Sequence, residues 1–354
     1  MKTQHKFVCF FLCVACCVGY MLAFCFSGKC SITKHGVVMV LSTGNMNFEK
    51  NAKFSNKFLK TGKKMPLEVE KPESIDEFMQ RYSAIHKRTN KYVSEMCRMY
   101  RNKIPGGKPP LLVNEKHKIA YCQTAKIGSD VWARALLILA GNNNYTEVMK
   151  MNGKQVIQAK KKHVKQLSQF PDLQQKQIMD TYTKFMFVRH PLSRLLSAFN
   201  DKLSPENETD IHDQQFKMIY RAIGADFKWD NKEKGNKVQF KDFLNMVVNS
   251  IYSQNPHWKA IHTSCFPCNV HYDIIGRFED FENEAKYIFK LANVTDFKFP
   301  RSKKKHITNS SKLDTIRSAY SSVPVPLLLD IYNKYKYDFT LFNYEIPLAM
   351  PFKE

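Results

Sequence analysis

Sequence patterns that mark several common classes of phosphate-binding and metal-binding protein are absent from this chain. It contains no G-x-x-x-x-G-K-[ST] loop, so a nucleoside triphosphate is not the ligand that the sequence predicts. Cys265 and Cys268 form a C-x-x-C pair, which could act in redox chemistry or supply half of a zinc site. Because no second cysteine pair stands at metal-ligand spacing after residue 26, we expect a disulfide that involves these residues and no metal centre.

Acidic residues are scarce relative to basic ones. The 354 residues include 32 Asp and Glu against 55 Lys and Arg, and the formal net charge is +23. This excess predicts attraction to polyanions, which could be nucleic acid, anionic lipid or an acidic glycan. A charge spread over the surface for solubility is the alternative. The hydrophobic content of 44% is ample for the core of one large domain or two average ones.

Charged residues are also absent from the stretch 7–26, which is long enough to span the hydrocarbon core of a bilayer. Its end, residues 24–26, offers no A-x-A-like cleavage site, so we predict a transmembrane signal anchor rather than a cleaved signal peptide. Residues 1–6 would then form a cytoplasmic tail, 27–75 a polar stem and 76–354 a luminal domain.

Four N-x-[ST] sequons lie beyond this segment, and such acceptors are used only in the secretory lumen. They are Asn144, Asn207, Asn293 and Asn309. Five cysteines also lie beyond it, an odd number whose pairing stays open. They are Cys30, Cys97, Cys122, Cys265 and Cys268. For a luminal protein the charge selects an acidic glycan, whereas a nucleic-acid binder would need exposure to the cytosol.

Short apolar runs alternate with amphipathic stretches over the rest of the chain, which predicts an α/β fold with a largely parallel sheet. The expected strands are 118–122, 184–188 and 270–276. The expected helices are 75–101, 130–140, 191–202, 281–291, 313–320 and 326–339. Residues 142–181 are basic and polar, and we interpret them as a surface excursion between two strand-loop-helix units.

The first strand-loop-helix unit places a lysine where its strand ends. At the carboxyl ends of parallel strands, helix N-termini offer unpaired N–H groups to anions. Lys126 stands in this loop together with Gly128, which allows close approach of the backbone, and Ser129, which adds a hydroxyl. The loop could therefore hold a terminal phosphosulfate.

The second unit places an arginine at the equivalent point. Arg189 leaves the strand, and Pro191 suits the first position of the following helix. Arg194 and Ser197 lie three residues apart on one face of that helix. A guanidinium fork, a hydroxyl and a helix N-terminus together suit a phosphate dianion. The apolar face of the helix, which includes Leu195, is expected to pack on the sheet.

The second unit also reads R-x-P-x-x-R-x-x-S-A-[FY], a signature of sulfotransferases. From about residue 113 to 344 the chain resembles the Golgi carbohydrate sulfotransferase family, which includes the chondroitin and dermatan 4-O-sulfotransferases and the glucuronyl 3-O-sulfotransferase. The blocks that carry the resemblance are Tyr121 to Trp132, Arg189 to Phe199, His257-Trp258, Cys265 to Cys268, Tyr272 to Gly276 and Tyr335 to Tyr344.

This resemblance implies a P-loop-like, three-layer α/β fold and 3′-phosphoadenosine 5′-phosphosulfate as the sulfate donor. It places Lys126 at the 5′-phosphosulfate, and Arg189 and Ser197 at the 3′-phosphate. The predicted donor-binding residues are Ala125, Lys126, Ile127, Gly128, Ser129, Asp130, Val131, Arg189, Pro191, Arg194 and Ser197. The implied enzyme is a type II protein of the Golgi membrane that sulfates a glycan hydroxyl, with the 4-O position of a chondroitin-type or dermatan-type galactosaminoglycan as the expected acceptor.

The donor loop departs from the family pattern Pro-Lys-x-Gly-Cys-[ST]-Asn-Trp. Ala125, Ser129, Asp130 and Val131 stand where Pro, Cys, Ser or Thr, and Asn are usual, and His190 replaces an acidic residue. A carboxylate at Asp130 would repel a bound phosphosulfate if it faced the site, although in the first turn of a helix it complements the dipole. The alternative function is therefore an inactive acidic-glycan-binding protein on the same fold.

Sulfuryl transfer needs stabilisation of the departing phosphate and removal of a proton from the attacking hydroxyl. We expect Lys126 to perform the first task and His257, in a block that the family shares, to perform the second. The alternatives for the base are His262, His271 and Glu279.

Overall fold

The computed structural model divides the chain into two units, Met1–Lys71 and Pro72–Glu354, which are described separately. The described residues are 22–26, 29–34, 37–42, 73–141, 144–203, 218–219, 223, 238–294, 297, 299–300 and 312–345, and for those before 43 the description covers the backbone alone.

The described part of the first unit is an antiparallel sheet in the order β1-β2-β3. Its strands are β1 (Leu22–Phe26), β2 (Lys29–Lys34) and β3 (Val37–Ser42). The end of the predicted transmembrane helix and part of the predicted stem are therefore extended, which suits their Val, Ile, Thr and Phe content. Residues 7–21 of that helix lie outside the described residues. Among the helices that the structure describes, none is both long and apolar enough to cross a membrane.

The second unit is built on a sheet in the order β4-β5-β6-β7. Its strands are β4 (Leu111–Asn114), β5 (Ile119–Cys122), β6 (Thr183–Val188) and β7 (Ile274–Arg277). The last three pair in parallel, and β4 runs antiparallel to β5. The predicted mixed α/β class with a mostly parallel sheet is confirmed. The parallel strands β5 and β6 carry their carboxyl ends to the same edge, where the two loops with Lys126 and Arg189 begin.

Helices and short 3-10 segments make up most of the remaining described chain. The helices are α2 (Ile75–Met99), α3 (Ser129–Leu139), α4 (Tyr145–Lys150), α5 (Gly153–His163), α6 (Asp172–Thr181), α7 (Pro191–Lys202), α9 (Phe240–Asn249), α10 (His262–Cys265), α11 (Phe281–Leu291), α12 (Leu313–Tyr320) and α13 (Val325–Leu341). The 3-10 segments are η2 (Leu167–Gln169), η4 (Ile251–Gln254) and η5 (Phe278–Asp280). The segment 142–181, predicted to be a surface excursion between the two strand-loop-helix units, contains α4, α5 and α6, each of which buries one side chain.

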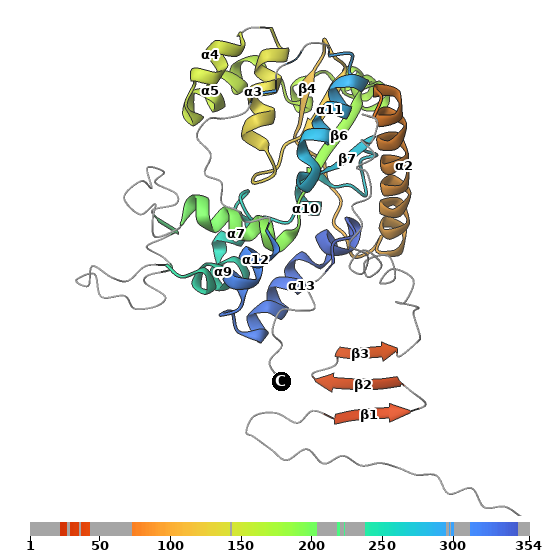
Figure 1. The fold of residues 1–354 in the computed structure, drawn as a ribbon, viewed down its shortest axis with the longest axis vertical. Coiled ribbons are helices and arrows are strands. Elements are labelled where there is room, and N and C mark those ends of the chain that lie inside the picture. The colour runs from red at the N-terminus through yellow and green to blue at the C-terminus, as the bar shows by residue number, and fades with distance from the viewer. Residues whose placement is uncertain are drawn as a thin grey trace, which may run out of the picture. The chain divides into compact units, whose positions relative to one another are not determined.

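Helices cover both faces of the sheet (Figure 1). On one face, the Trp132 ring of α3 lies 4.7 Å from Phe185 of β6 and 5.3 Å from Phe289 of α11. On the other, Cys122 at the end of β5 is bonded to Cys265 of α10. A second disulfide joins Cys97 of α2 to Cys268. The predicted participation of Cys265 and Cys268 in disulfides is confirmed, each with a distant partner.

A second apolar cluster lies among α7, α9, α12 and α13, beyond the end of β6 (Figure 1). Leu195 of α7 packs there, with Phe243, Trp258 and Tyr320, instead of on the sheet as predicted. The prediction that this face packs on the sheet was wrong because α7 leaves the end of β6 and runs away from the sheet. One side of α7 borders the Lys126 loop, while its apolar face packs in this second cluster.

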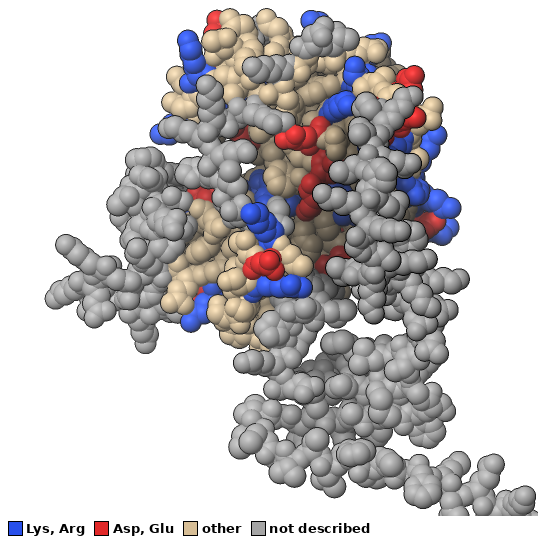
Figure 2. Space-filling model, in the orientation of Figure 1, with Lys and Arg blue, Asp and Glu red and all other residues tan. Residues whose placement is uncertain are grey.

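Charge is distributed over much of the surface. On the face drawn in Figure 2, the described Lys and Arg side chains lie on several separate parts of the surface, with acidic side chains among them. Among the described residues of this face, the basic side chains therefore do not form one continuous stripe.

Candidate functional site

The loop that follows β5 is shaped to present the N-terminus of α3. Lys126 and Gly128 both adopt left-handed backbone conformations, with φ of 68° and 81°. Gly128 is required there, because a Cβ atom would lie 2.3 Å from the ring of Phe281, and its φ disfavours other residues. It is also the N-cap of α3, which has no side-chain capping bond. The first N–H groups of α3 can therefore serve an anion.

The Lys126 ammonium projects into a largely buried site and meets a carboxylate. Its Nζ lies 3.0 Å from Oδ2 of Asp201 at the end of α7, and the Lys126 side chain is 15% exposed. Burial lowers the pKa of Lys126, and the charge of Asp201 acts in the opposite direction. Asp201 was missed by the sequence analysis, although it lies one helical turn beyond Ser197 of the signature.

Arg189, from the second strand-loop-helix unit, reaches the Lys126 loop. Its Nη1 donates to the carbonyl of Lys126 at 2.9 Å, and its Nε donates to Oγ of Ser193 at 3.0 Å. The guanidinium carbon lies 4.3 Å from the ring centre of Phe278. Burial lowers the pKa of Arg189 to about 10, which leaves it charged at neutral pH. The two cations that the sequence singled out therefore lie in one site.

Arg194 makes contacts of a different kind from those expected. Its guanidinium is buried and donates to the carbonyls of Ala125, Lys259 and Pro256, at 3.0, 2.7 and 3.3 Å. These bonds tie the Lys126 loop to the segment 255–261. Ser197, on the same face of α7, is also buried.

Asp130 does not oppose a ligand in the way its charge suggested. Its Oδ2 accepts from Nε of Arg134 at 3.0 Å, one turn along α3. Arg134 also donates to the carbonyls of Val148 and Met151. The carboxylate is thus compensated by an arginine that is itself fixed by α4. Beside this helix, Ile127 is fully buried in the apolar core.

His257 lies on the segment that Arg194 holds. It is half-buried, and its backbone N–H donates to Oδ1 of Asn255 at 2.9 Å. Burial lowers the pKa of His257 to about 4, and the charges of Lys202 and Lys126 act in the same direction. The imidazole is therefore neutral near pH 7 and able to accept a proton.

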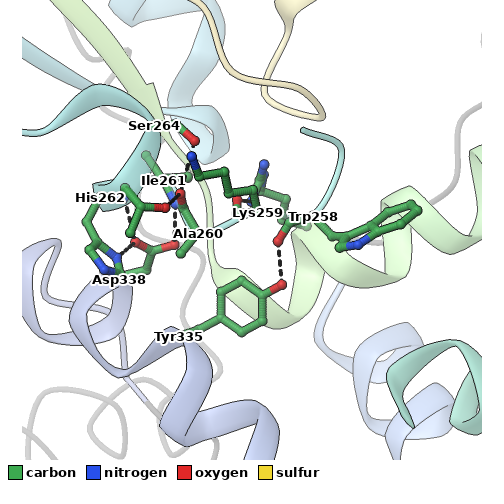
Figure 3. A network of polar contacts seen from close by, with 10 residues as sticks. Trp258, Lys259, Ala260, Ile261, His262, Ser264, Tyr335 and Asp338 are labelled. Carbon is green, nitrogen blue, oxygen red and sulfur yellow. Dashed lines mark hydrogen bonds and ion pairs between the residues drawn. The ribbon is translucent and has the colours of Figure 1, made fainter. Parts of the chain in front are cut away.

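A network from α13 fixes the rest of that segment (Figure 3). The carboxylate of Asp338 accepts from the backbone N–H groups of Ile261 and His262, at 2.7 and 2.9 Å, and lies 2.7 Å from Nδ1 of His262. The hydroxyl of Tyr335 donates to the carbonyl of Trp258. His262 is only 4% exposed, so the structure places this alternative base in a buried scaffold.

Of the two remaining alternatives for the base, Glu279 lies near Arg189, and its charge acts against the burial that lowers the pKa of Arg189. Glu279 accepts from the backbone N–H of His190 and from the hydroxyl of Tyr344, both at 2.9 Å. His271 is exposed just before β7. Within the described ranges, no group of three or more His, Cys, Asp or Glu side chains could hold a metal ion.

Comparison with known proteins places this chain in a family. The model of the sulfotransferase family matches residues 109–345, which include both strand-loop-helix units and the His257 segment. The chain belongs to the sulfotransferase family. This confirms the resemblance seen in the sequence blocks, and the protein is a sulfotransferase.

Its relatives are carbohydrate sulfotransferases. Carbohydrate sulfotransferase 11 of Rattus norvegicus is 28% identical over 260 residues, which is 72% of each chain. Carbohydrate sulfotransferase 14 of Danio rerio is 31% identical over 245 residues, covering 67% of this chain and 62% of the relative. Carbohydrate sulfotransferase 9 of Homo sapiens is 28% identical over 277 residues, covering 77% and 59%. No solved structure matches the chain.

Membership of the sulfotransferase family implies 3′-phosphoadenosine 5′-phosphosulfate as the donor, and the site fits an anion of this kind. The N-terminus of α3 carries no side-chain cap, and Lys126 stands beside it. In addition, the hydroxyl oxygen of Thr124 is buried without a hydrogen-bond partner among the described residues. A ligand oxygen near this loop would meet donors that the protein itself leaves available.

Proposed function

We propose that this sulfotransferase moves the sulfuryl group of 3′-phosphoadenosine 5′-phosphosulfate to the 4-O position of a chondroitin-type or dermatan-type galactosaminoglycan. The observation that carries the proposal is the 2.9 Å bond from the Arg189 guanidinium to the Lys126 carbonyl. It brings the Arg189 guanidinium to the backbone of the Lys126 loop, so that one nucleotide with an anionic group at each end can engage both cations.

In this proposal the two strand-loop-helix units hold opposite ends of the donor. Lys126 and the N-terminus of α3 bind the 5′-phosphosulfate, and Arg189 with Ser197 binds the 3′-phosphate. Arg194 acts through the backbone, because its three carbonyl bonds hold the Lys126 loop against the His257 segment. The other predicted donor-binding residues shape the loop and the start of α7.

The chain's own residues supply charge and proton transfer. The bound donor provides the sulfuryl group, whose sulfur forms a bond to the acceptor oxygen as its bond to the phosphate oxygen breaks. The Lys126 ammonium stabilises the negative charge that grows on that phosphate oxygen. His257, neutral at pH 7, takes the proton from the acceptor hydroxyl.

The acceptor and the compartment are inferred from several independent features. The sequence blocks resemble the chondroitin and dermatan 4-O-sulfotransferases, and a net charge of +23 favours an acidic chain. Two disulfides favour an oxidising compartment. The sequon residues Asn144 and Asn293 are exposed, whereas Asn207 and Asn309 lie outside the described residues. We therefore propose a luminal catalytic domain, anchored in the Golgi membrane by residues 7–26.

Transfer of labelled sulfate tests this function. The full chain, produced in a secretory host, would be given radiolabelled donor with desulfated chondroitin, dermatan, heparan precursor or N-glycan acceptors. We expect label in desulfated chondroitin or dermatan, and a loss of about 10²-fold or more for Lys126→Ala and for Arg189→Ala, because each removes a positive charge that binds the anionic donor.

The matched control for Lys126→Ala is an alanine replacement of a lysine on the exposed surface. Lys176 lies on α6 in an exposed ion pair with Asp180, so Lys176→Ala should transfer sulfate at the wild-type rate. Full labelling by both site variants would contradict the site. Binding of acidic glycan without any labelling would favour the inactive glycan-binding alternative.

A further inference from the structure

The carboxylate of Asp201 lies between two lysines at the end of α7. Its Oδ2 is 3.0 Å from Nζ of Lys126 and 3.3 Å from Nζ of Lys202. The side chain is 31% exposed, so the pair is partly shielded from water. Burial acts to raise the pKa of Asp201, but the charges of Lys126 and Lys202 outweigh it and hold the pKa below its ordinary value. Asp201 is therefore ionised at neutral pH.

Asp201 pairs with the ammonium of Lys126, which the proposed function places at the 5′-phosphosulfate of the donor. The charged groups that act on Lys126 are Asp201, Lys202 and Arg189, and of these Asp201 alone is negative. The imidazole of His257 faces the same group of charges, together with Arg194. A carboxylate in this position presents to Lys126 the charge that a phosphosulfate oxygen would present.

We propose that Asp201 is a displaceable counter-ion, a positioning residue that holds the Lys126 ammonium in the donor-free enzyme and yields it to the phosphosulfate when the donor binds. The proposal rests on the proposed function, because it needs Lys126 to meet the 5′ end of the donor. It assigns Asp201 no bond to the reacting atoms. The carboxylate keeps a buried lysine charged and oriented before the ligand arrives, and it competes with that ligand.

Nucleotide affinity tests the competition. Adenosine 3′,5′-bisphosphate would be titrated calorimetrically into the full chain at pH 7. Asp201→Asn removes the competing charge and should bind this nucleotide about three- to tenfold more tightly, which corresponds to loss of a partly exposed ion pair. Asp180→Asn is the matched control, since Asp180 pairs with Lys176 at 2.6 Å on the exposed surface of α6. The control should bind the nucleotide as the wild type does.

The pH dependence of turnover separates displacement from a static structural role. Without Asp201 the free enzyme loses the charge that raises the pKa of Lys126, so the alkaline limb of kcat/KM should move to lower pH. The alkaline limb of kcat should stay in place, because kcat reports the donor complex, in which phosphosulfate has replaced the carboxylate. Movement of both limbs, or of neither, would overturn the proposal, as would unchanged or weaker nucleotide binding.

Two further comparisons distinguish failure of the counter-ion proposal from misfolding of a variant and from failure of the proposed function. Asp201→Ser removes the same charge with a smaller side chain, so it replaces the Asn variant if thermal unfolding shows that the latter does not fold. If the wild type itself neither binds the nucleotide nor transfers sulfate, the proposed function fails. If the wild type does both and the neutral variants behave like Asp180→Asn, the counter-ion proposal alone fails.

Discussion

His257 holds its imidazole beside two lysines, and this environment sets the pH dependence that we expect of catalysis. Burial, with the charges of Lys202 and Lys126, lowers the pKa of His257 to about 4 from an ordinary 6.5. The unfolded chain therefore binds this proton more readily, and the stability contributed by neutral His257 is lost as pH falls from 6.5 towards 4.

The acid limb of turnover should report this histidine. For kcat/KM the limb should lie well below pH 6.5, since the free enzyme keeps His257 neutral there. For kcat it should lie at higher pH, because the negative charges of the bound donor offset the two lysines and raise the imidazole pKa. His257→Gln should lower kcat by about 10²- to 10⁴-fold. Identical limbs for both parameters in the wild type, or a fully active glutamine variant, would contradict the assignment.

At this scale the sequence predicted site residues only where a local motif indicates them. Lys126 and Arg189 were found because strand ends and helix N-termini are legible from local patterns, and the structure brings them together. The carbonyl bonds of Arg194 and the ion pair of Asp201 were not found. Both depend on which distant segments approach α7, and no local pattern records that approach.

Among the elements, the disulfide between β5 and α10 joins the strand that precedes the Lys126 loop to the helix that follows the His257 segment. Cys122 immediately precedes the Lys126 loop, and Cys265 ends the helix that follows the His257 segment. Replacing both cysteines by alanine should cost about 2–5 kcal/mol of unfolding free energy. It should also lower kcat, because the loop and the segment lose a common tether. Denaturant unfolding and sulfate transfer, both without reductant, measure the two effects.

The second disulfide provides the comparison. Cys97 and Cys268 join α2 to the chain after α10, and neither residue borders the Lys126 loop. Alanine replacement of this pair should reduce stability by a similar amount and change kcat much less. Equal losses of kcat in the two double variants would show that the tether acts through stability alone.

Element boundaries were predictable where one face of the element is strongly apolar. Helices α7, α11 and α12 have the predicted bounds, and β5 and β6 differ by one residue at their starts. The missed helices α4, α5 and α6 each bury one side chain, namely Val148, Val156 and Ile178. Their apolar period is too weak to detect. Capping boxes at Asn144 and Asn152 were the available signal.

For the molecule as a whole, the net charge of +23 has a measurable consequence for the acceptor. If the acceptor is an acidic glycan chain, its KM should rise steeply as salt is increased from about 50 to 300 mM, because exposed charges are screened over a Debye length of about 10 Å at 0.1 M. An uncharged galactosamine glycoside serves as the control, and its KM should change little. Equal salt dependence for the two acceptors would contradict electrostatic recruitment.

The fold class, a mixed α/β domain with a mostly parallel sheet, could be predicted from the alternation of apolar runs. The antiparallel edge strand β4 could not, since four residues after a proline pair carry little pattern. The extended backbone of residues 22–26 differs from the helix that a charge-free stretch suggested, because an absence of charge does not distinguish helix from strand.

The three carbonyl bonds of Arg194 bear on how the family signature should be used to diagnose activity. This arginine joins the Lys126 loop to the segment 255–261, so we expect a relative that has lost sulfate transfer to keep it. Its retention is therefore a marker of an intact scaffold. The position that we expect to distinguish active enzymes from inactive relatives is the lysine of the preceding loop.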